Sequence, residues 1–172
     1  MRRTTGFTLI ELVITLIILA IIAVLAIPKF ISLRHEARSE VINQLAVAAK
    51  AANDQVYMKS KLASYSTQSV NNRPDLIDVD LDGDGVFETR LKCGFLDNTD
   101  VAGRMTYSDE TLGFEYEGVD KTYFGYQSGS SSIKDSQCYF KYTQSWGTTN
   151  PSNCHNDQTA SQPGYEVVTD GC

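Results

Sequence analysis

The chain has few of the residues on which enzyme chemistry usually depends. Its 172 residues include only 2 histidines, His35 and His155. It contains no Gly-x-Ser-x-Gly sequence, no His-Glu-x-x-His sequence and no glycine-rich phosphate loop. Without a nucleophile beside a base, none of the common hydrolytic or phosphoryl-transfer sites can be assembled. We therefore expect a protein that is not an enzyme.

Basic residues are also scarce. Lys and Arg together number 15 against 21 Asp and Glu, which gives a formal net charge of −6. Nucleic-acid binding requires clustered positive charge, and no basic stripe with interleaved aromatic residues is present. We expect no specific nucleic-acid partner.

No pair of cysteines has the Cys-x-x-Cys spacing of a zinc site. The four cysteines are Cys93, Cys138, Cys154 and Cys172, all in the second half of the chain. An even number behind an export-type N-terminus predicts two disulfides in an oxidising compartment, and free buried thiols are the alternative. Four cysteines allow three pairings, between which the sequence alone does not choose.

What the sequence does have is a long apolar run, from Phe7 to Ile27. As a helix it would span roughly 30 Å, the thickness of a hydrocarbon core. Arg2 and Arg3 precede it, which favours a cytoplasmic N-terminus. No Ala-x-Ala cleavage pattern follows it, so an ordinary cleaved signal peptide is not indicated. Glu11 lies within the run, where a carboxylate costs a few kcal/mol in lipid.

The sequence GFTLIE, residues 6–11, resembles the processing site of type IV pilins and pseudopilins at every position. This resemblance implies that a prepilin peptidase removes residues 1–6 by cutting between Gly6 and Phe7, and that Phe7 is then N-methylated. It also implies that Glu11 meets the N-terminal amine of a neighbouring subunit during filament assembly. The alternative is a Glu tolerated near the start of any membrane anchor, where the helix dipole and headgroups favour it.

The resemblance implies the α+β pilin fold: a long N-terminal helix packed on a C-terminal antiparallel β-sheet head. We expect the helix over residues 7–62, with 7–27 crossing the inner membrane before assembly, and the head over 63–172. Pro28 should kink or loosen the helix. Beyond it, apolar residues at three- and four-residue steps predict one buried face, comprising Phe30, Leu33, Ala37, Val41, Leu45, Ala48, Ala52 and Val56. An independent second helix after the anchor is the alternative.

The head pattern predicts a connecting region from Ala63 to Leu76 and six short strands after it. Alternation in the third strand predicts that Leu112, Phe114 and Tyr116 pack inward while Gly113, Glu115 and Glu117 meet water. The strands are expected at Thr89–Gly94, Arg104–Tyr107, Leu112–Glu117, Thr122–Gln127, Cys138–Thr143 and Tyr165–Thr169.

The sequence DVDLDGDGVFE, residues 78–88, carries five carboxylates. Asp80, Asp82, Asp84 and Glu88 stand at the spacing of EF-hand positions 1, 3, 5 and 9, and Val86 would offer its carbonyl from position 7. Position 12 is a leucine, so the loop departs from an EF-hand and resembles shorter calcium loops of secreted and pilus-associated proteins. We expect a structural Ca²⁺ ion, because an all-protein oxygen cage suits Ca²⁺ better than Mg²⁺. The alternative is a solvated acidic turn.

The segment CYFKYT, residues 138–143, with a terminal cysteine, resembles the mannose-sensitive haemagglutinin pilins, a type IVa subgroup. This resemblance implies a Cys138–Cys172 disulfide, which leaves Cys93 with Cys154. Cys154–Cys172 is locally easier and stays open.

The resemblance implies a structural subunit that polymerises with minor pilins into a type IV pilus. The pilus would serve surface attachment and also motility. Its partners would be the prepilin peptidase, an inner-membrane assembly platform and an ATPase. The precursor would lie in the inner membrane, and the filament would be extracellular. A pseudopilin of a type II secretion system is the alternative. A membrane-anchored Ca²⁺-binding module that never polymerises is a third.

Overall fold

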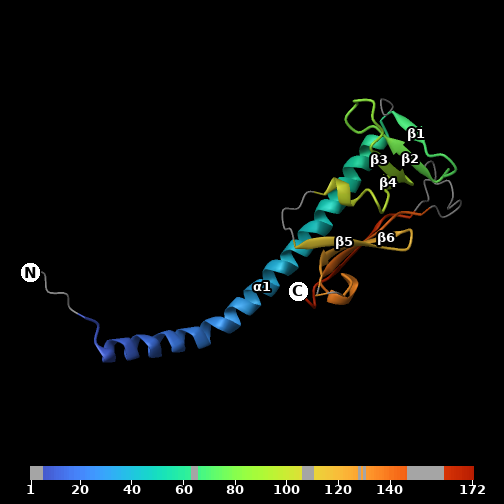
Figure 1. The fold of residues 1–172 in the computed structure, drawn as a ribbon. Helices are drawn as coiled ribbons and strands as arrows, with labels where there is room; N and C mark the ends of the chain where they lie inside the picture. Colours follow the sequence, from blue (N-terminus) through green and yellow to red (C-terminus); the bar gives the residue numbers. More distant parts are fainter. Residues whose placement is uncertain (1–5, 63–65, 106–110, 128, 130, 147–160) are drawn as a thin grey trace, which may run out of the picture. The chain divides into compact units, whose positions relative to one another are not determined.

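The computed structural model describes residues 6–62, 66–105, 111–127, 129, 131–146 and 161–172. The chain divides into two compact units, Met1–Ala37 and Arg38–Cys172, which are treated separately below. A single long helix is followed by antiparallel sheets (Figure 1), and the predicted α+β fold class is confirmed.

The helix α1 extends from Leu9 to Ser60. Thr8 caps its start, because the Glu11 N–H donates to Thr8 Oγ1 at 3.3 Å. Pro28 lies inside α1, and the helix continues beyond it. The alternative of an independent second helix after the anchor is therefore wrong.

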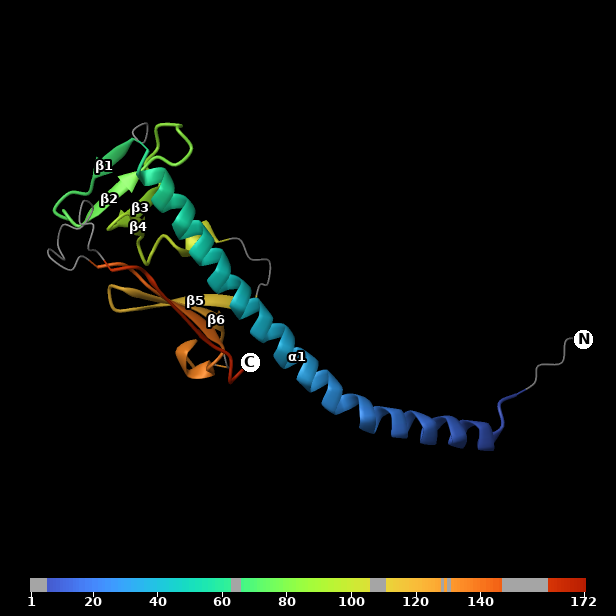
Figure 2. The same cartoon turned by 180° about the vertical axis from the view of Figure 1, so that it is seen from behind.

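The described part of the second unit also contains two four-stranded antiparallel sheets, in the strand orders β1-β2-β3-β4 and β5-β6-β7-β8. Figures 1 and 2 show both sheets beside the C-terminal part of α1. Two short 3-10 helices, η1 (Ala102–Arg104) and η2 (Lys134–Ser136), lie in the connections. The strands are β1 Thr67–Ser69, β2 Leu76–Val79, β3 Thr89–Lys92, β4 Phe95–Leu96, β5 Leu112–Glu117, β6 Lys121–Tyr126, β7 Tyr139–Thr143 and β8 Gly164–Val168.

Most predicted strands form within two residues of their expected ends, and two predictions are wrong. Arg104 ends the 3-10 helix η1 rather than starting a strand, and Tyr107 lies outside the described residues. The expected connecting region contains β1, which pairs with β2 although all three of its residues are exposed. The sequence of β1 shows no alternation of apolar and polar residues, because neither face of this strand is buried.

The alternation predicted for β5 holds only at its start. Leu112 is buried in the core, but Phe114 and Tyr116 are 46% and 45% exposed. The reason is position: β5 is an edge strand, and it has a partner on one side only. On the opposite face Glu115 and Glu117 are not simply solvated, because they accept hydrogen bonds from the Ile133 N–H and the Tyr123 hydroxyl.

One hydrophobic core joins α1 to both sheets. The buried face of the helix differs from the predicted one: Leu45 and Val56 are buried as expected, whereas Ala48 is exposed and Phe30 and Leu33 stay uncovered. Many alanines between positions 46 and 52 blur the helical period, so that two adjacent faces fit the pattern equally well. The buried face is Ile42, Leu45, Ala49, Asn53 and Val56.

A buried polar contact ties the helix to both sheets. Asn53 Oδ1 accepts the Leu96 N–H of β4 at 2.8 Å, and the Tyr142 hydroxyl of β7 donates to the Leu96 carbonyl at 2.7 Å. Both side chains are fully buried. Close packing of β6 on β7 also depends on Gly125, where an added Cβ would lie 2.3 Å from the Cys138 carbonyl oxygen.

Candidate functional site

The N-terminal motif presents an accessible peptide bond. Gly6 and Phe7 precede the helix and are exposed, and nothing lies within 4 Å of a Cβ built on Gly6. Residues 1–5 of the predicted leader lie outside the described residues. A protease that cuts between Gly6 and Phe7 would therefore meet non-helical chain and would not have to unwind a helix.

Glu11 lies in the first turn of α1, where the helix dipole favours a negative charge. Thr8 and Glu11 stand at the Thr-x-x-Glu spacing of a capping box, a signal that the sequence interpretation overlooked. Thr8 supplies one half of that box by accepting the Glu11 N–H. The pairing of Glu11 with the amine of a neighbouring subunit stays a prediction.

The apolar part of α1 is uncovered. The helix is long and apolar enough to cross a membrane, with a mean hydropathy of 3.1 in its most apolar window and none of that window buried. Eighteen large apolar side chains from Phe7 to Leu33 are exposed in the isolated chain. Such a surface requires lipid or other apolar helices against it.

Residues 80–88 of the five-carboxylate segment form the loop between β2 and β3, and Asp78 lies in β2. Gly83 and Gly85 have φ angles of 84° and 88°, which side-chain-bearing residues rarely adopt, so the glycines permit its tight turns. Asp80 is buried, and its two oxygens accept the N–H groups of Gly83 at 2.6 Å and Gly85 at 2.8 Å. These backbone hydrogen bonds lower the pKa of Asp80, and the one from the Gly85 N–H has the largest effect.

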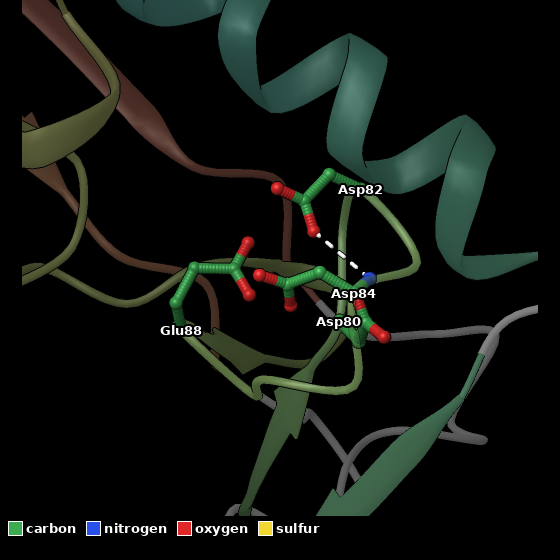
Figure 3. A group of neighbouring side chains, drawn as sticks. All are labelled: Asp80, Asp82, Asp84 and Glu88. Carbon is green, nitrogen blue, oxygen red and sulfur yellow. Dashed lines mark hydrogen bonds between the residues drawn. The ribbon is translucent and has the colours of Figure 1, made fainter.

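The predicted side-chain ligands come together in this loop (Figure 3). Asp80, Asp82, Asp84 and Glu88 each offer one carboxylate oxygen, and these oxygens lie within 4.8 Å of one another. Ligands on opposite sides of a Ca²⁺ ion would be about 4.6–5.2 Å apart, given bonds of about 2.3–2.6 Å. The spacing therefore fits such an ion.

Two contacts of the loop were not foreseen from the sequence. Arg104 of η1 forms an ion pair with Glu88 at 3.0 Å and also donates to the hydroxyl of Thr89. Lys59, near the end of α1, donates to the Leu81 carbonyl at 3.3 Å. Neither basic residue is close to the loop in sequence, so only the fold reveals that a guanidinium competes for one of the carboxylates.

A disulfide joins Cys138 to Cys172, the pairing that the pilin resemblance implied. It ties the start of β7 to the last residue of the chain. Cys93 is disulfide-bonded, and its predicted partner Cys154 lies outside the described residues.

Comparison with known proteins adds one match. Residues 1–27 match the family model described as the prokaryotic N-terminal methylation motif. No curated protein and no solved structure matches the chain. The motif implies processing by a prepilin peptidase and assembly into a filament or pseudopilus. The matched motif and the fold support the class of type IV pilins and pseudopilins, and they indicate a structural subunit and not an enzyme.

Proposed function

We propose that this chain is a structural subunit of a type IV pilus, which polymerises through its N-terminal helix into a surface filament used for attachment. The observation that carries the proposal is the methylation motif at the head of a helix whose apolar part is uncovered. Its partners would be further copies of itself, minor pilins, the prepilin peptidase, an assembly platform and an ATPase.

The exposed apolar side chains of the helix need an apolar environment around them. Each fully buried large apolar side chain contributes roughly 1.5–3 kcal/mol, so leaving eighteen of them in water would cost tens of kcal/mol. The inner membrane covers them before assembly, and neighbouring helices cover them afterwards. Because lipid and a helix bundle are both apolar, apolar burial alone does not select the filament.

Glu11 supplies the selectivity. In lipid a carboxylate costs a few kcal/mol, whereas in a filament it would pair with the amine that cleavage creates on Phe7 of a neighbouring subunit. The pair would favour assembly over the membrane and would set the axial register. Glu11→Ala and Glu11→Val should then be processed and membrane-inserted but poorly assembled.

The experiment compares these variants with Glu36→Ala, which removes another exposed Glu of the same helix. Sheared surface filaments and membrane-bound precursor are quantified in each strain. We expect filament loss for the Glu11 variants alone. Normal filament yield from either Glu11 variant would reject the pairing role.

A pseudopilin of a type II secretion system is the second candidate, and the carboxylate loop favours it, because such subunits often bind Ca²⁺. The disulfide-closed C-terminal segment favours the pilus. Deletion distinguishes the two: loss of surface filaments with normal protein secretion supports the pilus, and the reverse supports the pseudopilin.

We also propose that the loop binds a structural Ca²⁺ ion through Asp80, Asp82, Asp84 and Glu88, with the carbonyl of Val86. Four converging carboxylates repel one another, and the Arg104 guanidinium neutralises one of them. A divalent cation would offset the remaining repulsion.

Thermal unfolding with millimolar CaCl₂, MgCl₂ or chelator tests the Ca²⁺ proposal. Ca²⁺ should raise the melting temperature, by an amount set by its concentration relative to Kd. The shift should vanish in Asp82→Asn and persist in Asp170→Asn, an exposed control outside the loop. An equal melting temperature with Ca²⁺ and with chelator would rule out the proposed Ca²⁺ site.

A further inference from the structure

Two adjacent surface cavities of the second unit meet at Arg73 and Val119. The first, of about 320 Å³, is also lined by Asp97, Asn98 and Tyr116. The second, of about 490 Å³, continues past Arg73 to Lys92 and Trp146. We call the two together the Arg73 groove. Both volumes lie in the range of small-ligand sites.

Asn98 is the unusual residue in this groove. It is only 4% exposed, yet its side-chain amide makes no hydrogen bond to any described residue. Its main chain is held on both sides: the N–H donates to Gln144 Oε1 at 3.2 Å, and the carbonyl accepts from Thr122 Oγ1 at 2.6 Å. The amide is rigidly placed and its polar atoms still reach solvent, so its donors and acceptors are open to a ligand in the cavity.

Asp97 beside it has similar spare capacity. This residue is buried, and its Oδ1 accepts from both the N–H and the hydroxyl of Thr99. Its Oδ2 accepts nothing from the part of the chain that the structure describes. An acceptor and an amide therefore stand side by side in the first cavity.

Each cation of the groove already has a carboxylate partner. Asp75 accepts two hydrogen bonds from Arg73, both at 2.9 Å, and pairs with Lys92 at 3.2 Å. Arg90, which also lines the first cavity, is held by Asp78. A free anion thus meets no unpaired cation among these residues, and it would be repelled by Asp97.

Each of the two arginines uses its Nε and one Nη on its carboxylate, which leaves further N–H donors facing a half-exposed site. Tyr116 and Trp146 add aromatic walls, and the Lys92 ammonium lies 3.7 Å from the centroid of the Trp146 ring. An apolar ligand would leave the Asn98 and Asp97 groups unpaired, at a cost.

We propose that the Arg73 groove binds a neutral saccharide. Hydroxyl groups both donate and accept, so they satisfy an amide, a carboxylate and guanidinium N–H groups together. The apolar faces of sugar rings pack on aromatic side chains, here Tyr116 and Trp146. Such a ligand would give the proposed attachment role a target, but binding to the groove does not depend on filament assembly.

The test uses the full chain in a sugar-free zwitterionic detergent. Trp146 is the only tryptophan, so its fluorescence reports on the groove directly. The probes are cellobiose, lactose, maltose and N,N′-diacetylchitobiose, with sodium acetate and glycylglycine as charged comparators. We expect a saturable change with at least one disaccharide and none with the comparators.

Asn98→Ala should weaken that binding roughly tenfold or more, as expected for lost hydrogen bonds. Its melting temperature should stay unchanged, because the side chain holds no described part of the fold together. Asn43→Ala, an exposed control on α1, should bind normally. Tyr116→Ala, at a partly exposed position, gives a second variant that should also bind weakly.

Three results would overturn the proposal: no saturable change with any of the four disaccharides, undiminished binding by Asn98→Ala and Tyr116→Ala, or saturation by acetate or glycylglycine in place of a sugar. None of these results bears on assembly, which the Glu11 variants test separately.

Discussion

Replacing Asn53 by alanine should destabilise the second unit measurably, although it removes only a small side chain. Asn53 Oδ1 is the acceptor for the Leu96 N–H, and the site is fully buried. In the variant this N–H would have no acceptor and no access to water. An orphaned buried donor costs about 1–3 kcal/mol.

Two effects oppose that cost. Alanine has the higher helix propensity, by about 0.5–0.7 kcal/mol. Asn53 Nδ2 has no hydrogen-bond partner among the described residues, so its removal relieves a buried polar group, while the cavity left in the core adds a cost of similar size. The net loss should be about 1–2 kcal/mol in the free energy of unfolding, or a melting temperature lowered by roughly 3–8 °C.

Thermal and denaturant unfolding of the full chain in detergent measures this, with Asn43→Ala as the matched control. Asn43 is exposed on the same helix, so the control should keep only the propensity gain and be equally or more stable. Tyr142→Phe removes the hydrogen bond to the Leu96 carbonyl, and a double-mutant cycle should show coupling between the two side chains. Equal free energies of unfolding for Asn53→Ala and Asn43→Ala would show that the Asn53–Leu96 hydrogen bond does not stabilise the fold.

Three further predictions concern the rest of the head. Cys138→Ser with Cys172→Ser opens a loop with a sequence separation of 34, and denaturant unfolding should show a loss of about 3–4 kcal/mol. Lys134 holds the pKa of Glu117 down to about 2, against 4.5 for the free group. This pair therefore stabilises the fold above pH 4.5, and its contribution should fade as the pH drops towards 2. Glu117→Gln should flatten that part of the melting profile. Arg104→Gln should strengthen Ca²⁺ binding in calorimetry, because the loop glutamate loses its competing cation.

Each of these has a contrary result. A disulfide variant within about 1 kcal/mol of the parent would contradict the loop-closure estimate. An unchanged acid melting profile in Glu117→Gln would show that the ion pair with Lys134 is not formed in solution. Weaker Ca²⁺ binding by Arg104→Gln would mean that the guanidinium positions the loop and does not compete with the ion.

The sequence predicted those parts of the structure that depend on interactions between residues close together in the chain. The apolar run, the acid spacing around Asp82 and the alternation at Leu112 each depend on neighbours in the chain, and helix, loop and strand form there. Which face of α1 is buried depends on the sheets. Asn53 is polar, so no hydrophobic pattern would place it in a core, yet a backbone N–H from residue 96 requires it there.

Sites assembled from distant segments are beyond such patterns. The Arg73 groove combines the turn before β2, the residues after β4, the edge strand β5 and Trp146 after β7. Asn98 looks like an ordinary loop residue in the sequence. In the fold, Gln144 and Thr122 form hydrogen bonds with the main chain of Asn98 and the residue is buried. Its side chain has no hydrogen-bond partner among the described residues, and the sequence alone does not reveal this.

The most direct test of the central claim is the mass of the chain recovered from sheared cell-surface material. We expect an N-terminal peptide that begins at Phe7 and carries one added methyl group on its amine, in protein abundant enough to build filaments. A chain that still begins with Met1, or one found only in the membrane fraction, would contradict it.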